Sequence, residues 1–85
     1  MFNVLIEERV ISDLKHIDFS QKNKILSKVN DILSQNPYPK ASNPKKLKGT
    51  NSYRLRIGNY RAIYVIQDKN ICVFSIKHRK DAYKH

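Results

Sequence analysis

The sequence predicts an α+β fold in the order β-α-α-β-β-β, with a helical hairpin packed on one face of a small, mostly antiparallel sheet. Three observations support this fold class. Residues 2–6, FNVLI, are mostly apolar and of strand length. Two later stretches repeat apolar residues at helical spacing, and three strand-like segments after residue 51 are separated by short turns. Because 85 residues have room for one thin core, we expect a single domain over residues 1–85.

Two apolar stripes predict the helical hairpin. The first stripe is Val10, Leu14 and Ile17, and the second is Ile25, Leu26, Val29, Ile32 and Leu33. They predict a short helix over about residues 7–17, then a helix of about four turns with Ser20 as the candidate N-cap and its end at Asn36-Pro37. Because few residues join the two helices, they must lie antiparallel, with both stripes turned toward a sheet.

Three consecutive strands are expected over residues 52–57, 60–67 and 71–77. Gly58-Asn59 connect the first two, and glycine at the first central position of a two-residue loop fits a type II′ turn, which matches the twist of the strands. The preceding stretch, residues 36–51, holds all three prolines and shows no period, so we expect a loop there. This loop carries the basic residues Lys40, Lys45, Lys46 and Lys48 to the edge of the sheet.

The first hairpin of these strands concentrates arginine on one face. Side chains alternate along a strand, so Arg54 and Arg56 share one face while the apolar residues between them face the helices. With a two-residue loop, Arg56 pairs directly with Arg61, and opposed like charges destabilise a sheet by about a few tenths of a kcal/mol. Guanidinium groups suit phosphate, to which each donates two parallel hydrogen bonds. The alternative is that the three arginines are solvated and shield neighbouring apolar side chains with their stems.

The net charge of +10 lies entirely in the second part of the chain. Residues 1–37 contain five basic and five acidic residues, whereas residues 38–85 contain twelve basic and two acidic ones. A neutral scaffold followed by a strongly basic segment indicates a polyanionic partner, and nucleic acid is the first candidate. An acidic protein would satisfy the same charge. Basic residues kept for solubility are the remaining alternative, but solubility alone does not predict the segregation.

Other classes of protein fit the sequence poorly. The apolar run at the start is shorter than a signal-peptide core of about 7–15 residues, and no stretch approaches the roughly 20 apolar residues of a membrane span. The single cysteine, Cys72, cannot form an internal disulfide, so we expect a cytoplasmic protein. His16, His78 and His85 show no ligand spacing with one another or with Cys72, so no metal site is expected.

The last predicted strand continues into IKHRKDAYKH, which brings further candidate residues to the arginine face. Pairing through the second turn places Lys77 or His78 near Arg61, so that Arg79 and Tyr83 can lie over the same face. Cleavage of RNA through its 2′-OH needs a base, cations that stabilise the phosphorane and an acid for the leaving oxygen. An aromatic ring can hold a splayed base. Among these side chains, His78 is the one whose ordinary titration range lies near neutrality.

Several segments together resemble the RelE toxins of the RelE/ParE superfamily of toxin–antitoxin modules. They are KKLKGTNSYRLRIGNYRAIYVI, VFSIKHRKDAYKH and the opening VLIEERVISDLKHI, so the resemblance covers nearly the whole chain. It implies a RelE-like fold and a ribosome-dependent endoribonuclease that cuts mRNA in the ribosomal A site. The family's reaction uses no metal or other cofactor and leaves a 2′,3′-cyclic phosphate and a 5′-OH.

The resemblance also implies which residues act. The positions that match the family's catalytic residues are Arg54, Arg56, Arg61, Arg79 and Tyr83, and His78 joins them as a candidate on its own chemistry. Some relatives have lysine at the first two positions, and arginine is a poor base, so His78 and Tyr83 become the candidates for proton transfer. Base and acid are not assigned individually. Contacts to RNA are expected from Lys45, Lys46, Lys48, Lys77 and Lys80, with a solvated loop as the alternative for the first three.

The family implies partners as well. They are the A site of the 30S ribosome with its mRNA, and an antitoxin resembling RelB, expected to be acidic and helical, with which the toxin could form a heterotetramer. Two other functions stay open. One is a non-enzymatic toxin, similar to ParE, that binds and inhibits DNA gyrase, and the other is a catalytically decayed module that only binds RNA or ribosomes. Retention of Arg61, Arg79 and Tyr83 favours the enzyme.

Overall fold

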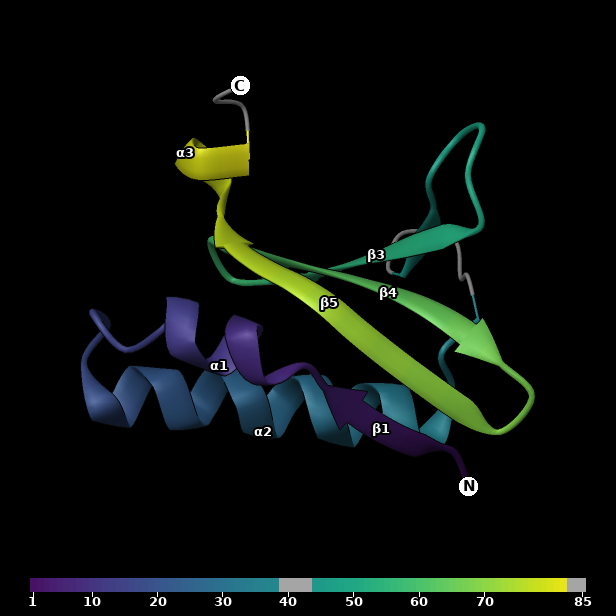
Figure 1. Cartoon of the computed structure of the whole chain (residues 1–85), viewed down its shortest axis with the longest axis horizontal. Helices are drawn as coiled ribbons and strands as arrows, with labels where there is room; N and C mark the ends of the chain where they lie inside the picture. Colours follow the sequence, from purple (N-terminus) through teal and green to yellow (C-terminus); the bar gives the residue numbers. More distant parts are fainter. Residues whose placement is uncertain (39–43, 83–85) are drawn as a thin grey trace.

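The computed structural model describes residues 1–38 and 44–82 and confirms the α+β architecture (Figure 1). The elements in chain order are β1 (Asn3–Ile6), α1 (Glu8–Asp13), α2 (Phe19–Gln35), β2 (Lys45–Lys46), β3 (Ser52–Ile57), β4 (Tyr60–Gln67), β5 (Asn70–His78) and α3 (Arg79–Ala82). The strands form one sheet in the order β1-β5-β4-β3-β2. α1 and α2 lie on one side of this sheet, and α3 stands at the end of β5.

The three long strands form the expected meander. β3 and β4 are antiparallel, as are β4 and β5, whereas β1 pairs with β5 in parallel. Gly58 has φ +57° in the first tight turn, and Asp68 has φ +56° in the second. A left-handed first residue is what the hairpin turns that match strand twist require. The register Ile57 opposite Tyr60 and Arg56 opposite Arg61 confirms the sequence-based prediction.

The helical hairpin differs from the prediction at its joint. α1 ends at Asp13 rather than near Ile17, and Asp18, not Ser20, is the N-cap of α2. The Asp18 carboxylate accepts a hydrogen bond from the backbone N–H of Gln21 at 3.4 Å. Because α2 starts at Phe19, Ser20 lies inside the first turn, where its side chain cannot act as the cap.

The core lies between the helical hairpin and the sheet. Its buried members are Val10, Leu14, Ile25, Val29, Leu33, Leu55, Ala62, Tyr64, Ile71, Val73 and Ile76. The Tyr64 hydroxyl lies in this core and donates a hydrogen bond to the Pro37 carbonyl at 2.6 Å. This bond satisfies a polar group that would otherwise be costly to bury, and it ties the segment after α2 to the sheet.

The predicted loop over residues 36–51 contains one short strand. β2 pairs with β3, with Lys45 opposite Arg54 and Lys46 opposite Tyr53. Gly49, with φ +77°, lies in the turn that returns the chain to β3. Lys40 lies outside the described residues. Across residues 1–38 and 44–82, none of the helices has the length and hydropathy needed to cross a membrane.

Candidate functional site

Five basic residues share the face of the sheet that points away from α1 and α2. Arg56, Arg61 and Lys77 are cross-strand partners on β3, β4 and β5, and Lys45 is the partner of Arg54 on β2 and β3. Since paired residues point to the same side of a sheet, these five side chains form one surface, which we call the basic face. Leu55 and Ala62, which are the strand neighbours of these arginines on β3 and β4, point into the core.

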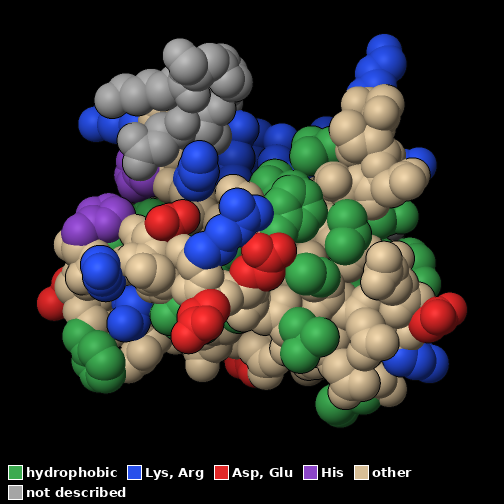
Figure 2. All heavy atoms as spheres, in the orientation of Figure 1, with side chains coloured by type: hydrophobic (Ala, Val, Ile, Leu, Met, Phe, Trp, Pro, Cys, Tyr) green, Lys and Arg blue, Asp and Glu red, His purple; other side chains and the backbone are tan. Residues whose placement is uncertain are grey.

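The basic face is a concentrated source of positive charge. Lys45, Arg56 and Lys77 are exposed, whereas Arg54 and Arg61 are half-buried. In Figure 2 a group of Lys and Arg side chains lies in the upper part of the molecule, the acidic side chains lie below this group, and further basic side chains are scattered among them. Cations held at adjacent register positions raise the local positive potential and attract a polyanion.

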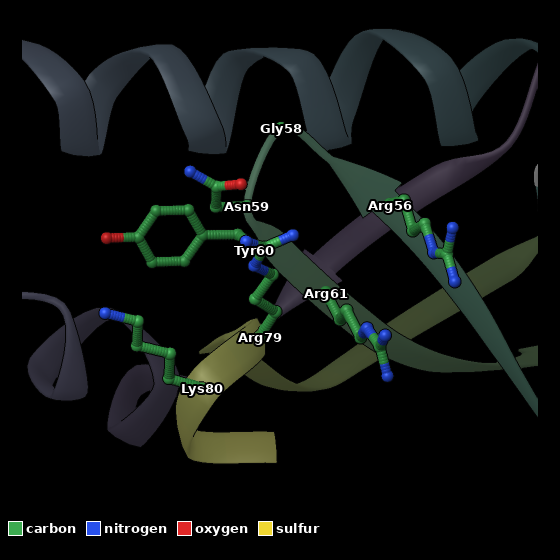
Figure 3. Close-up of a pocket in the computed structure, with 7 residues that line it drawn as sticks. All are labelled: Arg56, Gly58, Asn59, Tyr60, Arg61, Arg79 and Lys80. Atoms are coloured by element: carbon green, nitrogen blue, oxygen red, sulfur yellow. The ribbon is translucent and has the colours of Figure 1, made fainter. Parts of the chain in front are cut away.

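A pocket of about 440 Å³ opens where the basic face meets α3. It is lined by Arg56, Gly58, Asn59, Tyr60, Arg61, Arg79 and Lys80 (Figure 3). Arg56 and Arg61 extend in the same direction from β3 and β4, and Arg79 and Lys80 come from α3 on the side where Tyr60 lies. Four of these seven residues therefore carry cationic side chains, and the four come from three different elements.

The backbone fixes the position of α3 beside this pocket. The N–H of Arg79 donates to the carbonyl oxygen of Asn59 at 2.7 Å, which joins the start of α3 to the β3–β4 turn. The turn depends on Gly58, whose left-handed conformation would strain any side-chain-bearing residue. One short turn thus determines both the pairing of Arg56 with Arg61 and the approach of Arg79.

The expectation that His78 joins the arginine face is wrong. Lys77 is the partner of Arg61, so His78, the next residue along β5, pairs with Tyr60 and points to the helix side of the sheet. Its ring meets the Tyr60 ring edge-on, with the ring centroids 5.2 Å apart. There it lines a second cavity of about 370 Å³, together with Asp13 and His16 near α1.

The remaining predicted residues have varied positions. Lys45 belongs to the basic face, whereas Lys46 pairs with Tyr53 on the opposite side of β3, and Lys48 is exposed in the turn near Gly49. Lys80 lines the pocket. Tyr83 lies outside the described residues. Within the described parts of the chain, no three His, Cys, Asp or Glu side chains are grouped as metal ligands.

Tyr60 lines the pocket, although the sequence did not single it out as a site residue. It is half-buried, and it contacts both the pocket and the cavity that holds His78. The signal that could have found it is its place directly after the Gly58-Asn59 turn, one residue from Arg61. An aromatic ring beside clustered cations is a recurrent arrangement in sites for single-stranded nucleic acid.

The arrangement of the pocket suits a phosphodiester. Guanidinium groups on separate elements can hold the two non-bridging oxygens and stabilise the charge that builds up in a pentacoordinate phosphorane. The Tyr60 ring offers an apolar surface at the rim, where a base next to that phosphate could stack. Charge and shape both favour a nucleic acid over a small neutral ligand.

Comparisons with known proteins agree with this geometry. A family model described as the ParE toxin of type II toxin–antitoxin systems, parDE, matches residues 4–83. The protein named "Putative toxin RelE1" from Methanocaldococcus jannaschii is 40% identical over 88 residues, which span 99% of this chain and 97% of that protein. Both matches extend over almost the whole chain.

Solved structures show the same fold. A chain of the archaeal RelE–RelB complex from Pyrococcus horikoshii OT3 has a TM-score of 0.73 and 32% identity, covering 92% of this chain and 94% of that chain. A chain of the RelBE2 toxin–antitoxin complex from Mycobacterium tuberculosis has a TM-score of 0.77 at 21% identity, covering 92% of this chain and 98% of that one. By its sequence and its fold, the chain belongs to the RelE/ParE superfamily of type II toxin–antitoxin toxins.

Proposed function

We propose that this toxin is a ribosome-dependent endoribonuclease that cleaves mRNA in the A site and so inhibits translation. The observation that carries the proposal is the pocket lined by the four cations Arg56, Arg61, Arg79 and Lys80 together with the Tyr60 ring. A pocket with four cations in its lining offers several donors to the phosphates of RNA, which a toxin that acts only by protein contact does not need. The 40% identity to a RelE1 toxin supports the same reading.

In the proposed reaction, the 2′-oxygen of a nucleotide attacks the adjacent phosphorus, and the bond from phosphorus to the 5′-oxygen breaks. The 2′-OH gives up its proton to a base, and the departing 5′-oxygen accepts a proton from an acid, which leaves a 2′,3′-cyclic phosphate and a 5′-OH. Arg61 and Arg79 stabilise the phosphorane, with Arg56 beside them and Arg54 further along β3. Tyr83 is a candidate for proton transfer on family resemblance.

The basic face and the β2 region extend the contact beyond the pocket. Lys45 and Lys77 lie on the basic face, and Lys46 and Lys48 lie near its edge at β2 and the following turn. Their exposed ammonium groups can bind the phosphates of mRNA or of ribosomal RNA without reading sequence. In this proposal they orient the toxin so that the pocket faces the codon.

The partner that controls the toxin is proposed to be an acidic, helical antitoxin resembling RelB. The similar toxin chain from Pyrococcus horikoshii was solved as a RelE–RelB complex. A toxin with a net charge of +10 would attract an acidic partner over long range, which raises the association rate. Antitoxin bound over the basic face would exclude RNA from the pocket.

The test is to incubate the purified toxin with translating ribosomes and to map mRNA 5′ ends, alongside a DNA gyrase supercoiling assay. Cleavage within A-site codons is expected, with gyrase unaffected. Lys15→Ala is the matched control, because it removes an exposed charge from the neutral first part of the chain. Intact mRNA combined with inhibited gyrase would overturn the proposal. It would favour the second candidate, a gyrase-binding toxin, to which the matching ParE family model points.

A further inference from the structure

Two hydrogen bonds hold the junction between β5 and α3, and both are donated by backbone N–H groups of α3. The N–H of Arg79 donates to the Asn59 carbonyl at 2.7 Å. The N–H of Lys80 donates to Nδ1 of the His78 imidazole at 3.2 Å. The His78 ring is itself held edge-on against Tyr60. Both backbone donors belong to residues whose side chains line the pocket, so these bonds control where the two cations point.

We propose that His78 is a positioning residue that caps the start of α3 and thereby holds Arg79 and Lys80 in the pocket. The inference rests on the proposed function only in taking that pocket as the place of RNA cleavage. His78 does not line the pocket, and its ring lies on the helix side of β5. It therefore acts through α3 rather than on the reacting atoms.

The cap requires one protonation state of the imidazole. A ring nitrogen can accept the Lys80 N–H only when it carries no proton, so Nδ1 must be bare and the proton of the neutral ring lies on Nε2. Protonation of Nδ1 turns this acceptor into a donor that faces another donor. The cap is then lost, and α3 is held at its start by the Arg79 bond to Asn59.

Several charged and titratable side chains lie around His78. From the α1 side, Asp13 and His16 line the same cavity, with Leu14 and Ile17 as apolar walls. Lys77 precedes it on β5, and Arg79 and Lys80 follow it in α3. Because His16 is a second imidazole in this cavity, a variant at His16 is needed to separate the effects of the two histidines.

Three variants separate the roles of the hydrogen-bond acceptor, the ring and the titratable group of His78. His78→Asn keeps an acceptor at the position of Nδ1 but does not titrate near neutrality. His78→Phe keeps a ring against Tyr60 but has no acceptor. His16→Asn, the matched control, removes the neighbouring titratable ring from the same cavity without touching the bond to Lys80. Thermal unfolding of each variant checks that the fold is intact.

Two readouts are measured at about pH 7.5 and about pH 5.5, on either side of the ordinary titration range of histidine. The first is the hydrogen-exchange rate of the Lys80 amide by NMR, and the second is mRNA cleavage on ribosomes. For His78→Phe, we expect faster exchange of the Lys80 amide and about a fivefold loss of cleavage, because a side-chain cap typically favours its helix by about that factor in the equilibrium constant. His78→Asn is expected to keep wild-type exchange and cleavage at the higher pH. In wild type, both the protection of the Lys80 amide and cleavage should decline at the lower pH, and this decline should be absent in His78→Asn.

Two results would overturn the inference. If His78→Asn lost as much cleavage as His78→Phe, the imidazole would be transferring a proton rather than capping. If the Lys80 amide exchanged at the wild-type rate in His78→Phe, the cap would not hold α3. Failure of the wild-type protein to cleave mRNA would sink the proposed function instead, and the exchange comparison would still decide whether His78 caps α3.

Discussion

Two neighbouring rows of the same three strands have opposite character. Leu55, Ala62 and Ile76 are cross-strand partners on the covered face, and each is at most 3% exposed. One register position further on, Arg56, Arg61 and Lys77 are partners on the basic face. The apolar row stabilises the fold by burying surface. The basic row places like charges opposite one another, which costs the sheet stability, and it presents cations to an anion that binds this face.

The comparison shows how a small toxin separates folding from function. With one thin sheet, the chain cannot build the site in a separate layer, so the two roles alternate along single strands. A variant in one row should therefore change one property and leave the other nearly constant. The predictions below test this separation, from the largest expected effect to the smallest.

Arg79→Ala is expected to have the largest effect. Removing one charge that stabilises the transition state should lower the rate of mRNA cleavage on ribosomes by about a thousandfold. The backbone bond from Arg79 to Asn59 does not depend on the side chain, so α3 stays in place. The thermal midpoint should stay within about a degree or two of wild type. Cleavage at the wild-type rate would show that the Arg79 side chain does not take part in the reaction.

Leu55→Ala tests the opposite row. Leu55 has no exposed surface, so the substitution should lower the free energy of unfolding by about 3 kcal/mol, measured by urea denaturation. Cleavage per folded molecule should be unchanged, because the residue does not line the pocket. A specific loss of cleavage in a variant that is still folded would show that the two rows are coupled.

Tyr64→Phe tests a polar group inside the apolar layer. Loss of the bond to Pro37 should lower the free energy of unfolding near neutral pH by about 1 kcal/mol. Burial, reinforced by the neighbouring Tyr53, raises the pKa of the Tyr64 phenol above its ordinary value of 10.0.

The raised pKa of Tyr64 gives a pH dependence of defined sign. Below the ordinary pKa of 10.0, the phenol is protonated in the folded and unfolded states, and its contribution to stability is complete. Above that pH, the unfolded chain releases the proton while the folded protein keeps it, so stability falls as the pH rises. Urea denaturation at alkaline pH should show a smaller decline in Tyr64→Phe than in wild type. If stability fell equally in the two proteins at alkaline pH, the raised pKa of Tyr64 would not be the cause of the decline.

The smallest effect is expected for the exposed basic residues. Arg56→Ala and Lys77→Ala should each reduce the slope of log affinity for single-stranded RNA against log salt concentration by about 0.7. Fluorescence anisotropy with a labelled RNA measures this slope. Lys15→Ala, away from the basic face, should leave the slope unchanged. A slope that did not respond to either basic-face variant would mean that RNA binds elsewhere.

Most of the sheet could be predicted from the sequence because local signals determine it. Gly58 fixes the first turn, and the turn fixes Arg56 opposite Arg61, as the structure confirms. Alternation then separates the core side chains from the arginines. The positions of Arg56 and Arg61 could therefore be predicted without knowing any contact between distant parts of the chain.

The parts that could not be predicted depend on contacts from outside their own segment. The two-residue strand β2 exists only because β3 pairs with it, and α3 is held by the turn at Asn59 and by His78. The side of the sheet taken by His78 depended on whether it or Lys77 faces Arg61, and a shift of one residue moves a side chain to the opposite face.

The separation of the two rows is tested most directly by the free energy of unfolding of Arg61→Ala, measured by urea denaturation. Arg61 sits between Arg56 and Lys77 in the basic row. If that row serves binding rather than folding, the variant should be as stable as wild type, or more stable by about a few tenths of a kcal/mol through relief of repulsion. A loss of more than about 1 kcal/mol would show that the arginine supports the fold and would contradict the separation.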